Sequence, residues 1–330
     1  MSDVQSPALS GPADAVVDVR ELCKRYGTKD AVDGVSFQVR PGEVFGLLGP
    51  NGAGKTTTLE CLVGLRKPTA GTIRILGMDP AERTEEFRQS VAVQPQEGAL
   101  FPNLTVHETV QLWASFYPDP AVVDAVLADV GLAEEAYRRV QALSGGQRRR
   151  LLLAVTVVGR PDVLVLDEPA AGLDPQSRKN LWAVVRAHRE RGGTVLLTTH
   201  DMTEATELCD RVAVIVGGRI AACDTPAALV AQLADTSTVT FTADGSASLE
   251  SVRLLSSTAA VEAAPIEGGR VAVRVRTRDA DETLRSIAAD QELQVRGLDV
   301  VRGGLEEVFE TLATGAGTRA ADVIRTPEGS

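Results

Sequence analysis

The architecture of this chain is set by one glycine-rich stretch, Gly49-Pro50-Asn51-Gly52-Ala53-Gly54-Lys55-Thr56, which fits the pattern G-x-x-x-x-G-K-[ST]. The apolar run VFGLL (44–48) predicts a strand before it, and TTTLECLVG (56–64) predicts a helix after it. A glycine-rich loop in that context turns backbone N–H groups toward phosphate oxygens at the positive end of the helix. Lys55 is then expected to meet the β- and γ-phosphates of a nucleotide, and Thr56 to ligate Mg²⁺. A chance match in an ordinary loop is the less favoured alternative.

A second apolar run, VLVLDE (163–168), predicts a buried strand that delivers two carboxylates at its C-terminal end. Ligands bind at this end of the strands in open α/β sheets. Asp167 is placed to hold Mg²⁺ through the water shell of the ion, and Glu168 can accept a proton from an attacking water molecule. A helix cap after the strand is the alternative, and Pro169, the next residue, is consistent with it. Beside a phosphate loop we favour the catalytic interpretation, which predicts a nucleotide hydrolase.

A third stretch, Leu143-Ser144-Gly145-Gly146-Gln147, narrows the class of hydrolase. Ser144 and Gln147 have the spacing of a capping box, so the stretch predicts a helix start, and its glycines leave N–H groups open to an anion. An ordinary capped helix is the alternative. The sequence LSGGQ arises by chance in about one chain of this length per thousand or fewer.

In their order along residues 16–232, these stretches resemble the ATP-binding cassette (ABC) ATPases. The resemblance implies an α/β P-loop NTPase domain with a helical subdomain, which binds ATP and Mg²⁺ and hydrolyses ATP. It assigns catalysis to Glu168, His200, Gln96 and Lys55, and Mg²⁺ binding to Thr56, Gln96 and Asp167.

The resemblance also implies roles for residues outside the three stretches. Tyr26, in KRYG, is similar to the aromatic residue that stacks on adenine, and His200, in TTHD, to the switch histidine. Gln96 is similar to the Q-loop glutamine, and it is chosen over Gln94 because the family pattern places that glutamine after a proline. A surface aromatic, a strand-end cap and a polar loop residue are the respective alternatives. Two further groups are assigned to nucleotide binding. The first comprises the phosphate loop with Thr57 and the D-loop aspartate Asp174. The second would contact the nucleotide bound by an opposite subunit and comprises Ser144, Gly145, Gly146 and Gln147.

Composition excludes several classes of function. The 330 residues carry 34 basic and 45 acidic side chains, a formal net charge of −11, which argues against nucleic acid as a partner because phosphate neutralisation needs a Lys/Arg surface. The run Arg148-Arg149-Arg150 is accordingly interpreted as a solvated or internally paired helix face. No run reaches the ~18 apolar residues of a membrane helix. The cysteines, which show no C-x-x-C spacing, are expected to be reduced thiols: Cys23, Cys61, Cys209 and Cys223.

The expected organisation is a flexible leader (1–14), an ABC ATPase domain (15–232) with a helical insert at about 98–160, an accessory domain (233–314) and a flexible tail (315–330). Within the insert, Thr105 and Glu108 predict a capping box. Four large apolar side chains then follow at the spacing of one helix face: Val106, Val110, Trp113 and Tyr117. We expect this stripe to pack in the core, and a groove that faces a partner is the alternative.

The accessory segment has a different pattern. TVTFT (238–242) and VAVRVR (271–276) alternate with period two, which is typical of half-buried strands. A helix is expected around 249–255, between two strands, and another around 284–288, with a strand at 293–301 and a last helix at 305–312 after it. The resulting order β-α-β-β-α-β suggests a small α+β domain of ferredoxin-like type.

Among ABC proteins, a transporter ATPase subunit is favoured over a soluble ATPase of DNA repair, chromosome organisation or translation. Gln96 and Leu143 are only 47 positions apart, which leaves no room for a long coiled coil, and the chain has one cassette rather than two. The resemblance then implies a membrane-spanning subunit on a separate chain, a second cassette that closes head to tail with this one, and a cytoplasmic position on the inner face of the membrane. The ending GLEEVFETLAT (304–314) resembles drug- and antibiotic-export ATPases of the daunorubicin-resistance type, so export of drugs, antibiotics, lipids or polysaccharides is expected. An importer is the alternative within the class.

Overall fold

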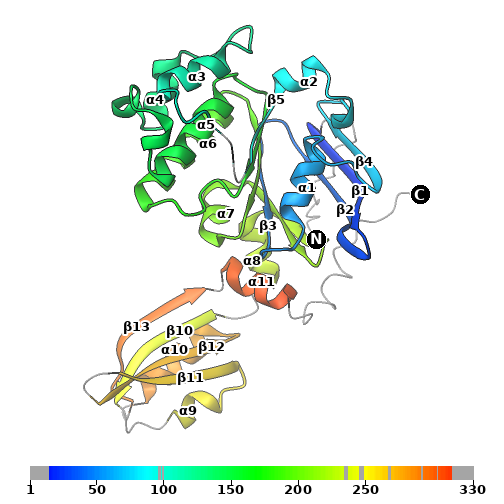
Figure 1. Cartoon of the computed structure of the whole chain (residues 1–330). Coiled ribbons are helices and arrows are strands. Elements are labelled where there is room, and N and C mark those ends of the chain that lie inside the picture. The colour runs from blue at the N-terminus through cyan, green and yellow to red at the C-terminus, as the bar shows by residue number, and fades with distance from the viewer. Residues whose placement is uncertain are drawn as a thin grey trace, which may run out of the picture. The chain divides into compact units, whose positions relative to one another are not determined.

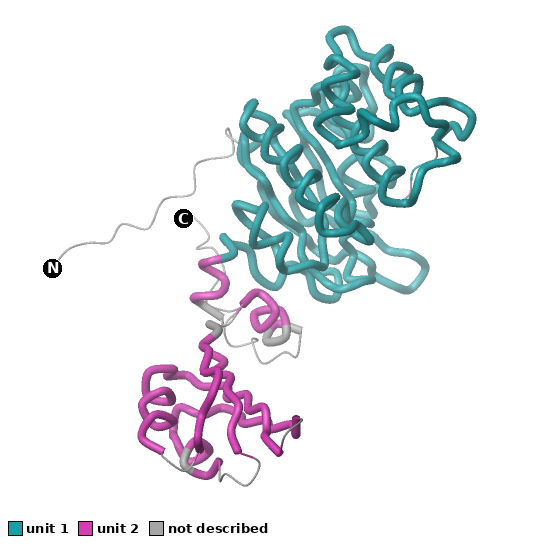
Figure 2. Tube along the Cα trace, turned by 90° about the vertical axis from the view of Figure 1, so that its left-hand side faces the viewer, with its two compact units in different colours: residues 1–226 teal, residues 227–330 magenta. Residues whose placement is uncertain are grey.

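The computed structural model describes residues 15–95, 98, 100–233, 237–244, 249–266, 269–290, 293–302 and 304–313. The chain divides into two compact units, residues 1–226 and 227–330 (Figure 2). The expected leader and tail lie outside the described residues. The first unit ends six residues before the predicted domain boundary, inside the segment that forms helix α8 (Pro226–Leu233).

Two sheets are formed by the strands of the first unit. These strands are β1 (Val17–Tyr26), β2 (Lys29–Val39), β3 (Val44–Leu48), β4 (Ala70–Ile75), β5 (Val91–Gln94), β6 (Val163–Asp167), β7 (Thr194–Thr199), β8 (Arg211–Val216) and β9 (Arg219–Asp224). The larger sheet has the order β5-β6-β7-β3-β8-β9 and is parallel except for the pair β8–β9; the smaller is antiparallel, in the order β2-β1-β4 (Figure 1). The predicted strands at 44–48, 163–166 and 195–199 are confirmed. Strands β3, β6 and β7 are buried at every residue, because both faces of the sheet are covered.

Helices cover the larger sheet from both sides. Besides three short 3₁₀ helices, the described part of this unit has α1 (Lys55–Leu62), α2 (Glu85–Ser90), α3 (Val106–Ala114), α4 (Val123–Asp129), α5 (Gly145–Val157), α6 (Pro175–Glu190) and α7 (Met202–Leu208). On one face, Phe45 and Leu47 share a core with the smaller sheet, and Phe37 stacks on Phe45 with ring centroids 5.1 Å apart. On the other face, Gly46 lies so close to the end of α7 that a Cβ there would be 2.7 Å from Cys209 Sγ. Successive residues of β3 therefore face opposite layers, the smaller sheet on one side and α7 on the other.

Strand order brings the functional segments to one edge of the sheet. Strand β7 pairs with both β3 and β6, and all three run in parallel, so the phosphate loop after β3, the carboxylates at the end of β6 and the histidine after β7 meet at their carboxyl ends. Both predicted capping boxes are present, at Thr105 with Glu108 and at Ser144 with Gln147. The four cysteines are free thiols.

The predicted aromatic helix face is wrong in part. Helix α3 ends at Ala114, so Tyr117 lies in the following turn and not on the same helix. Val106 and Val110 are buried as expected, whereas Trp113 is only partly buried and the neighbouring Phe116 is 66% exposed. The periodicity continued by coincidence past the end of the helix.

The second unit is a four-stranded antiparallel sheet with helices. Its elements follow α8 in the order β10 (Ser237–Asp244), α9 (Glu250–Arg253), β11 (Thr258–Ile266), β12 (Arg270–Thr277), α10 (Ala280–Ala289), β13 (Arg296–Arg302) and α11 (Leu305–Ala313). The strand order is β11-β12-β10-β13, and Val239, Phe241 and Val273 pack with Val252 of α9 and Ile287 of α10 in one core. The element order β-α-β-β-α-β from β10 to β13 is that of ferredoxin-like units. The assignment of this unit as an accessory domain stays a prediction.

A buried histidine near the end of α6 makes the stability of the fold depend on pH. His188 is buried, a Cβ on Gly193 would lie 2.2 Å from its Nε2, and this nitrogen has no hydrogen-bond partner among the described residues. Burial lowers the pKa of His188, and the nearby Arg191 lowers it further.

Because folding favours the neutral ring of His188, this contribution to stability is complete above the unfolded pKa of about 6.5 and is lost as the pH falls through the folded pKa. We expect the thermal midpoint of the wild type to fall more steeply between about pH 7.5 and pH 5.5 than that of His188→Gln; parallel curves would contradict this assignment.

Candidate active site

The phosphate loop joins the end of β3 to the start of α1, as the sequence predicts. Two of its glycines lie where no side chain fits. A Cβ on Gly49 would lie 2.5 Å from the carbonyl oxygen of Ile215, and a Cβ on Gly54 would lie 2.4 Å from that of Ala31. Gly54 also has a φ of 105°, in the region that favours glycine. The loop therefore depends on these glycines for its close approach to β8 and β2.

Lys55, the first residue of α1, points back into this loop. Its side chain is only 4% exposed, and its Nζ donates hydrogen bonds to the carbonyl oxygens of Gly49 (2.7 Å) and Pro50 (3.2 Å). The same Nζ lies 3.1 Å from Glu168 Oε1. The ammonium group thus joins the phosphate loop directly to the end of β6.

Asp167, the last residue of β6, forms a cluster with two hydroxyl groups. Its Oδ1 accepts a hydrogen bond of 3.3 Å from Thr56 and one of 2.5 Å from Thr198 on the neighbouring strand β7. A hydroxyl and a carboxylate are oxygen donors, which suit a Mg²⁺ ion that keeps most of its water ligands. The donor set therefore fits the predicted metal. Gln96, the third predicted ligand and a predicted catalytic residue, lies outside the described residues, while Gln94 is buried in β5.

Glu168 follows β6 in an unusual conformation. Its φ is 46°, the left-handed region, which costs a residue with a side chain on the order of 1–3 kcal/mol and occurs preferentially at functional sites. Its backbone N–H donates to the hydroxyl (3.0 Å) and to the carbonyl oxygen (3.2 Å) of Thr198. These contacts aim the carboxylate toward Lys55 and His200.

The carboxylate of Glu168 is buried between two basic groups. Its Oε1 lies 3.1 Å from Lys55 Nζ, and its Oε2 lies 3.3 Å from His200 Nδ1. Burial alone would raise the pKa of Glu168, but hydrogen bonding and charge attraction from Lys55, with a smaller part from His200, lower it below its usual range. Glu168 is therefore ionised at neutral pH, as a proton acceptor must be. His200 has half of its side chain exposed, so it can meet a ligand on its other side.

The LSGGQ segment begins α5 and presents its polar groups to solvent. Ser144 is exposed and caps the helix, and Gln147 both completes the capping box and donates a 2.8 Å hydrogen bond to Glu135. The hydrogen bonds of this segment go to its own helix and the adjoining turns. The segment is thus folded and available to a second molecule.

Tyr26 and Asp174 lie in distinct surroundings. Tyr26 ends β1, is 42% exposed, and has the cationic groups of Lys24 and Arg66 5.2 and 5.6 Å from its ring centroid.

Asp174 caps α6, accepting hydrogen bonds from Gln176 N (3.0 Å), Ser177 N (2.9 Å) and Ser177 Oγ (2.6 Å). The bonds from Ser177 lower the pKa of Asp174. A structural role for Asp174 is thus evident, and its part in nucleotide binding stays a prediction, as does that of Tyr26.

Sequence reasoning missed Thr198 and the particular role of Arg149. Thr198 lies directly opposite Asp167 in the pairing of β6 with β7, and the register of two parallel strands was the only signal for it.

The arginine run was expected to be solvated or internally paired. Arg148 is exposed, as expected of a solvated residue. Arg149 donates to the carbonyl oxygens of Glu168 and Pro169. Arg150 donates to the carbonyl oxygens of Val130 and Gly131.

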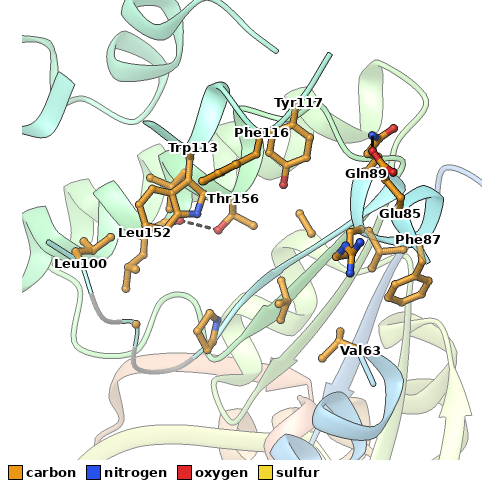
Figure 3. Close-up of a pocket in the computed structure, with 17 residues that line it drawn as sticks. Val63, Glu85, Phe87, Gln89, Leu100, Trp113, Phe116, Tyr117, Leu152 and Thr156 are labelled. Atoms are coloured by element: carbon orange, nitrogen blue, oxygen red, sulfur yellow. Dashed lines mark hydrogen bonds between the residues drawn. The ribbon is translucent and has the colours of Figure 1, made fainter. Parts of the chain in front are cut away.

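A groove with an aromatic wall lies beside α3, and none of the described residues that line it belongs to the ionised cluster. Figure 3 shows Trp113 and Phe116 projecting from one wall, with Tyr117 beside them and Phe87 of α2 across the opening. The groove has a volume of about 840 Å³, and Leu152 and Thr156 of α5 also line it. Phe101, whose ring packs at 6.1 Å from that of Trp113, is 54% exposed. Partly exposed aromatic side chains that share one hollow are typical of a docking surface.

Comparison with known proteins agrees with this geometry. A family model described as "ABC transporter" matches residues 32–171. The "Nod factor export ATP-binding protein I" of Paraburkholderia xenovorans (strain LB400) is 47% identical over 223 residues, which cover 66% of this chain and 73% of that protein. The protein of the same name from Rhizobium etli is 40% identical over 222 residues, which cover 66% of this chain and 70% of that protein.

Solved structures share the fold of the first unit. One titled "Structure of ATP binding subunit of ABC transporter" has a TM-score of 0.61 and 28% identity, covering 66% of this chain and 92% of that one. The dimeric cassette MJ0796, bound to ADP and Pi in a post-hydrolysis state, has a TM-score of 0.58 and 25% identity, covering 63% of this chain and 98% of that one. None of the helices in the described ranges has the length and apolar character needed to span a membrane.

Proposed function

The chain belongs to the ABC transporter family as an ATP-binding, ATP-hydrolysing subunit, and from this premise we propose that it drives an exporter whose membrane-spanning subunit is a separate chain. The observation that carries the proposal is the convergence of Lys55, Glu168 and His200 on one edge of the sheet, next to the phosphate loop. Export is supported by relatives that are 40–48% identical and are named for export.

In the proposed mechanism, the side chains of this cluster divide the work of hydrolysis. Lys55 exchanges its present carbonyl and carboxylate partners for phosphate oxygens and offsets the charge that develops on them. Glu168, ionised and fixed by its backbone contacts, accepts the proton of the attacking water. His200, at 3.3 Å from Glu168, orders the water and the departing phosphate.

Mg²⁺ is part of this proposal, with Thr56 and Asp167 as the described residues that would hold it and Gln96 as the third. The ion would supply Lewis-acid stabilisation of the phosphate charge when bound. Thr198 keeps Asp167 oriented through its 2.5 Å hydrogen bond, which is the support that a ligating carboxylate needs.

We propose further that two cassettes close head to tail around two ATP molecules. The exposed start of α5, with Ser144 as its cap, is a helix N-terminus open to an anion from outside this chain. Two weak surfaces joined by nucleotide bind strongly only when ATP is present, so ATP shifts the population toward the closed dimer. The dimer of MJ0796 is consistent with such an assembly.

The groove beside α3 is the proposed docking surface for the membrane-spanning subunit, placed on the inner, cytoplasmic side of the membrane. Its aromatic wall belongs to the helical segment and its opposite wall, with Phe87 and Arg88, to α2 and β5. Closure of the cassettes can therefore be transmitted to a segment seated between these two parts. We also propose that the second unit, residues 227–330, serves assembly or transport and not nucleotide binding.

Phe116→Ala tests the docking surface. Because Phe116 is 66% exposed in the isolated chain, its removal should leave the thermal midpoint and basal ATPase activity nearly unchanged. Loss of an aromatic anchor from an interface centre should nevertheless lower the amount of co-purified membrane subunit at least about tenfold. Tyr137→Ala is the matched control, since Tyr137 is 85% exposed and does not line the groove. Equal recovery of the partner with both variants would remove the groove from the proposal.

The direction of transport is tested in membrane vesicles that contain this chain with its co-expressed membrane partner. Export predicts ATP-dependent accumulation of daunorubicin or another probe inside inverted vesicles, in which the ATPase faces the medium, and no accumulation with Glu168→Gln. ATP-dependent release of preloaded probe from inverted vesicles would indicate an importer. A chain that never associates with membranes when all candidate partners are co-expressed would indicate a soluble ATPase of another class.

A further inference from the structure

Arg149 links the helix that starts at the LSGGQ segment to the turn that carries Glu168. It lies in the first half of α5, five residues after the cap Ser144, and its side chain is half-buried. Its Nη2 donates to the carbonyl oxygen of Glu168, and its Nε donates to that of Pro169 at 3.0 Å. One rigid guanidinium thus binds two successive carbonyl groups.

The turn that Arg149 binds needs such support. Glu168 has its φ at 46°, so its backbone persists there only because surrounding contacts hold it. On the side of β7, Thr198 accepts the N–H of Glu168. On the opposite side, the carbonyl oxygen of Glu168 accepts from Ala171 N (3.2 Å) and from Arg149. Thr198 therefore ties this turn to β7, and Arg149 ties it to the helix α5.

We propose that Arg149 is a positioning residue, which fixes the turn of the catalytic Glu168 and couples it to movement of α5. The inference rests on the proposed function, because it needs Glu168 as proton acceptor and the start of α5 as the surface that meets the opposite nucleotide. Any displacement of α5 when Ser144 engages that nucleotide is transmitted through Arg149 to the Glu168 of the same chain. Each nucleotide then influences hydrolysis of the other.

The surroundings of Arg149 favour this role over that of a solvated helix charge. Partial burial lowers the pKa of Arg149, while the charges of Glu168, Glu204 and Asp167 oppose that shift, so the half-buried guanidinium feels the field of three carboxylates. Arg150 makes an analogous pair of bonds, but to Val130 and Gly131 at the end of α4, inside the helical segment. Of the three consecutive arginines, the middle one therefore reaches the catalytic turn.

The test compares Arg149→Met with Arg148→Met, which makes the same change one residue away at an exposed position. A displacement of about 1 Å at a catalytic group costs on the order of 10²-fold, so kcat of Arg149→Met should fall about 10- to 100-fold with KM for ATP within about twofold of wild type. The Hill coefficient for ATP hydrolysis should also fall toward one, which simple loss of stability would not cause. Arg148→Met should match the wild type in both quantities.

Arg149→Lys keeps the test decisive if the methionine variant does not fold. A lysine retains the charge but cannot bind two carbonyl groups with a planar fork, so kcat should be reduced about 3- to 10-fold at a near-native thermal midpoint. Wild-type kcat and Hill coefficient in this variant, or in a folded Arg149→Met, would overturn the inference. If Glu168→Gln retained full turnover, the proposed function would fail instead; loss of turnover in Glu168→Gln with no effect at Arg149 would defeat only the inference drawn here.

Discussion

Glu168→Gln is expected to lower the ATPase turnover number on the order of 10²–10⁴-fold, because an amide cannot accept the proton of the attacking water. Glutamine keeps the shape of the side chain and can still accept a hydrogen bond from Lys55 and pair with His200. Nucleotide binding, measured with a fluorescent ATP analogue, should therefore survive. Steady-state phosphate release gives the turnover number.

The same variant should accumulate as an ATP-bound dimer, because closed cassettes reopen only after hydrolysis removes the γ-phosphate. Size-exclusion chromatography with saturating ATP and Mg²⁺ resolves this species from the monomer. Glu190→Gln, at the solvent-exposed end of α6, is the matched control and should behave as the wild type. Undiminished turnover of Glu168→Gln would contradict its catalytic assignment, and a monomer at saturating ATP would contradict the head-to-tail dimer.

Lys55→Met is expected to weaken ATP binding by about 30-fold or more, since loss of a buried charged contact costs about 2–5 kcal/mol and every 1.4 kcal/mol is tenfold. The nucleotide-free protein should also lose about 3–5 kcal/mol of unfolding free energy, because the carboxylate of Glu168, 8% exposed, loses the nearer of its two basic partners and keeps only the half-exposed His200. Titration with ATP and chemical denaturation measure the two effects separately.

The double variant Lys55→Met with Glu168→Gln separates the two roles of the lysine. With no buried carboxylate left without its lysine, most of the lost unfolding free energy should return, while ATP affinity should stay low. The wild type, the two single variants and the double variant complete a thermodynamic cycle for the pair. A double variant as unstable as Lys55→Met would mean that the ion pair has little part in the stability of the empty site.

The fold of the first unit was predictable because its signals are local. The runs that form β3, β6 and β7 are short and continuously apolar, which indicates buried parallel strands. The turns after them carry the phosphate loop, the paired carboxylates and the histidine, a combination that indicates a nucleotide-binding site. From those segments Lys55, Asp167 and Glu168 were expected to act at one site, and the family resemblance added His200. The structure brings the four within hydrogen-bond or ion-pair reach of one another or of a shared neighbour.

What the sequence did not predict depends on contacts between distant segments. Thr198 reaches Asp167 because two strands pair in one register, and Arg149, on α5, bonds to Glu168, which lies 19 residues farther along the chain. Neither relation has a periodicity along the chain. The end of α3 at Ala114 was missed for the opposite reason: the spacing of Tyr117 continued a helical pattern that the backbone did not follow.

The ion pair between Lys55 and Glu168 has a consequence for the resting protein. The carboxylate lies on the ammonium group that, in the proposed mechanism, a phosphate oxygen takes over, so the chain supplies an intramolecular competitor for its own substrate. Free phosphate gains little binding free energy when it displaces the Glu168 carboxylate from Lys55. A triphosphate makes many further contacts with the loop, and these supply enough binding free energy for the exchange. We therefore expect the empty site to discriminate between nucleotide and free phosphate before any second cassette arrives, and the base to be released for catalysis by the same event that delivers ATP.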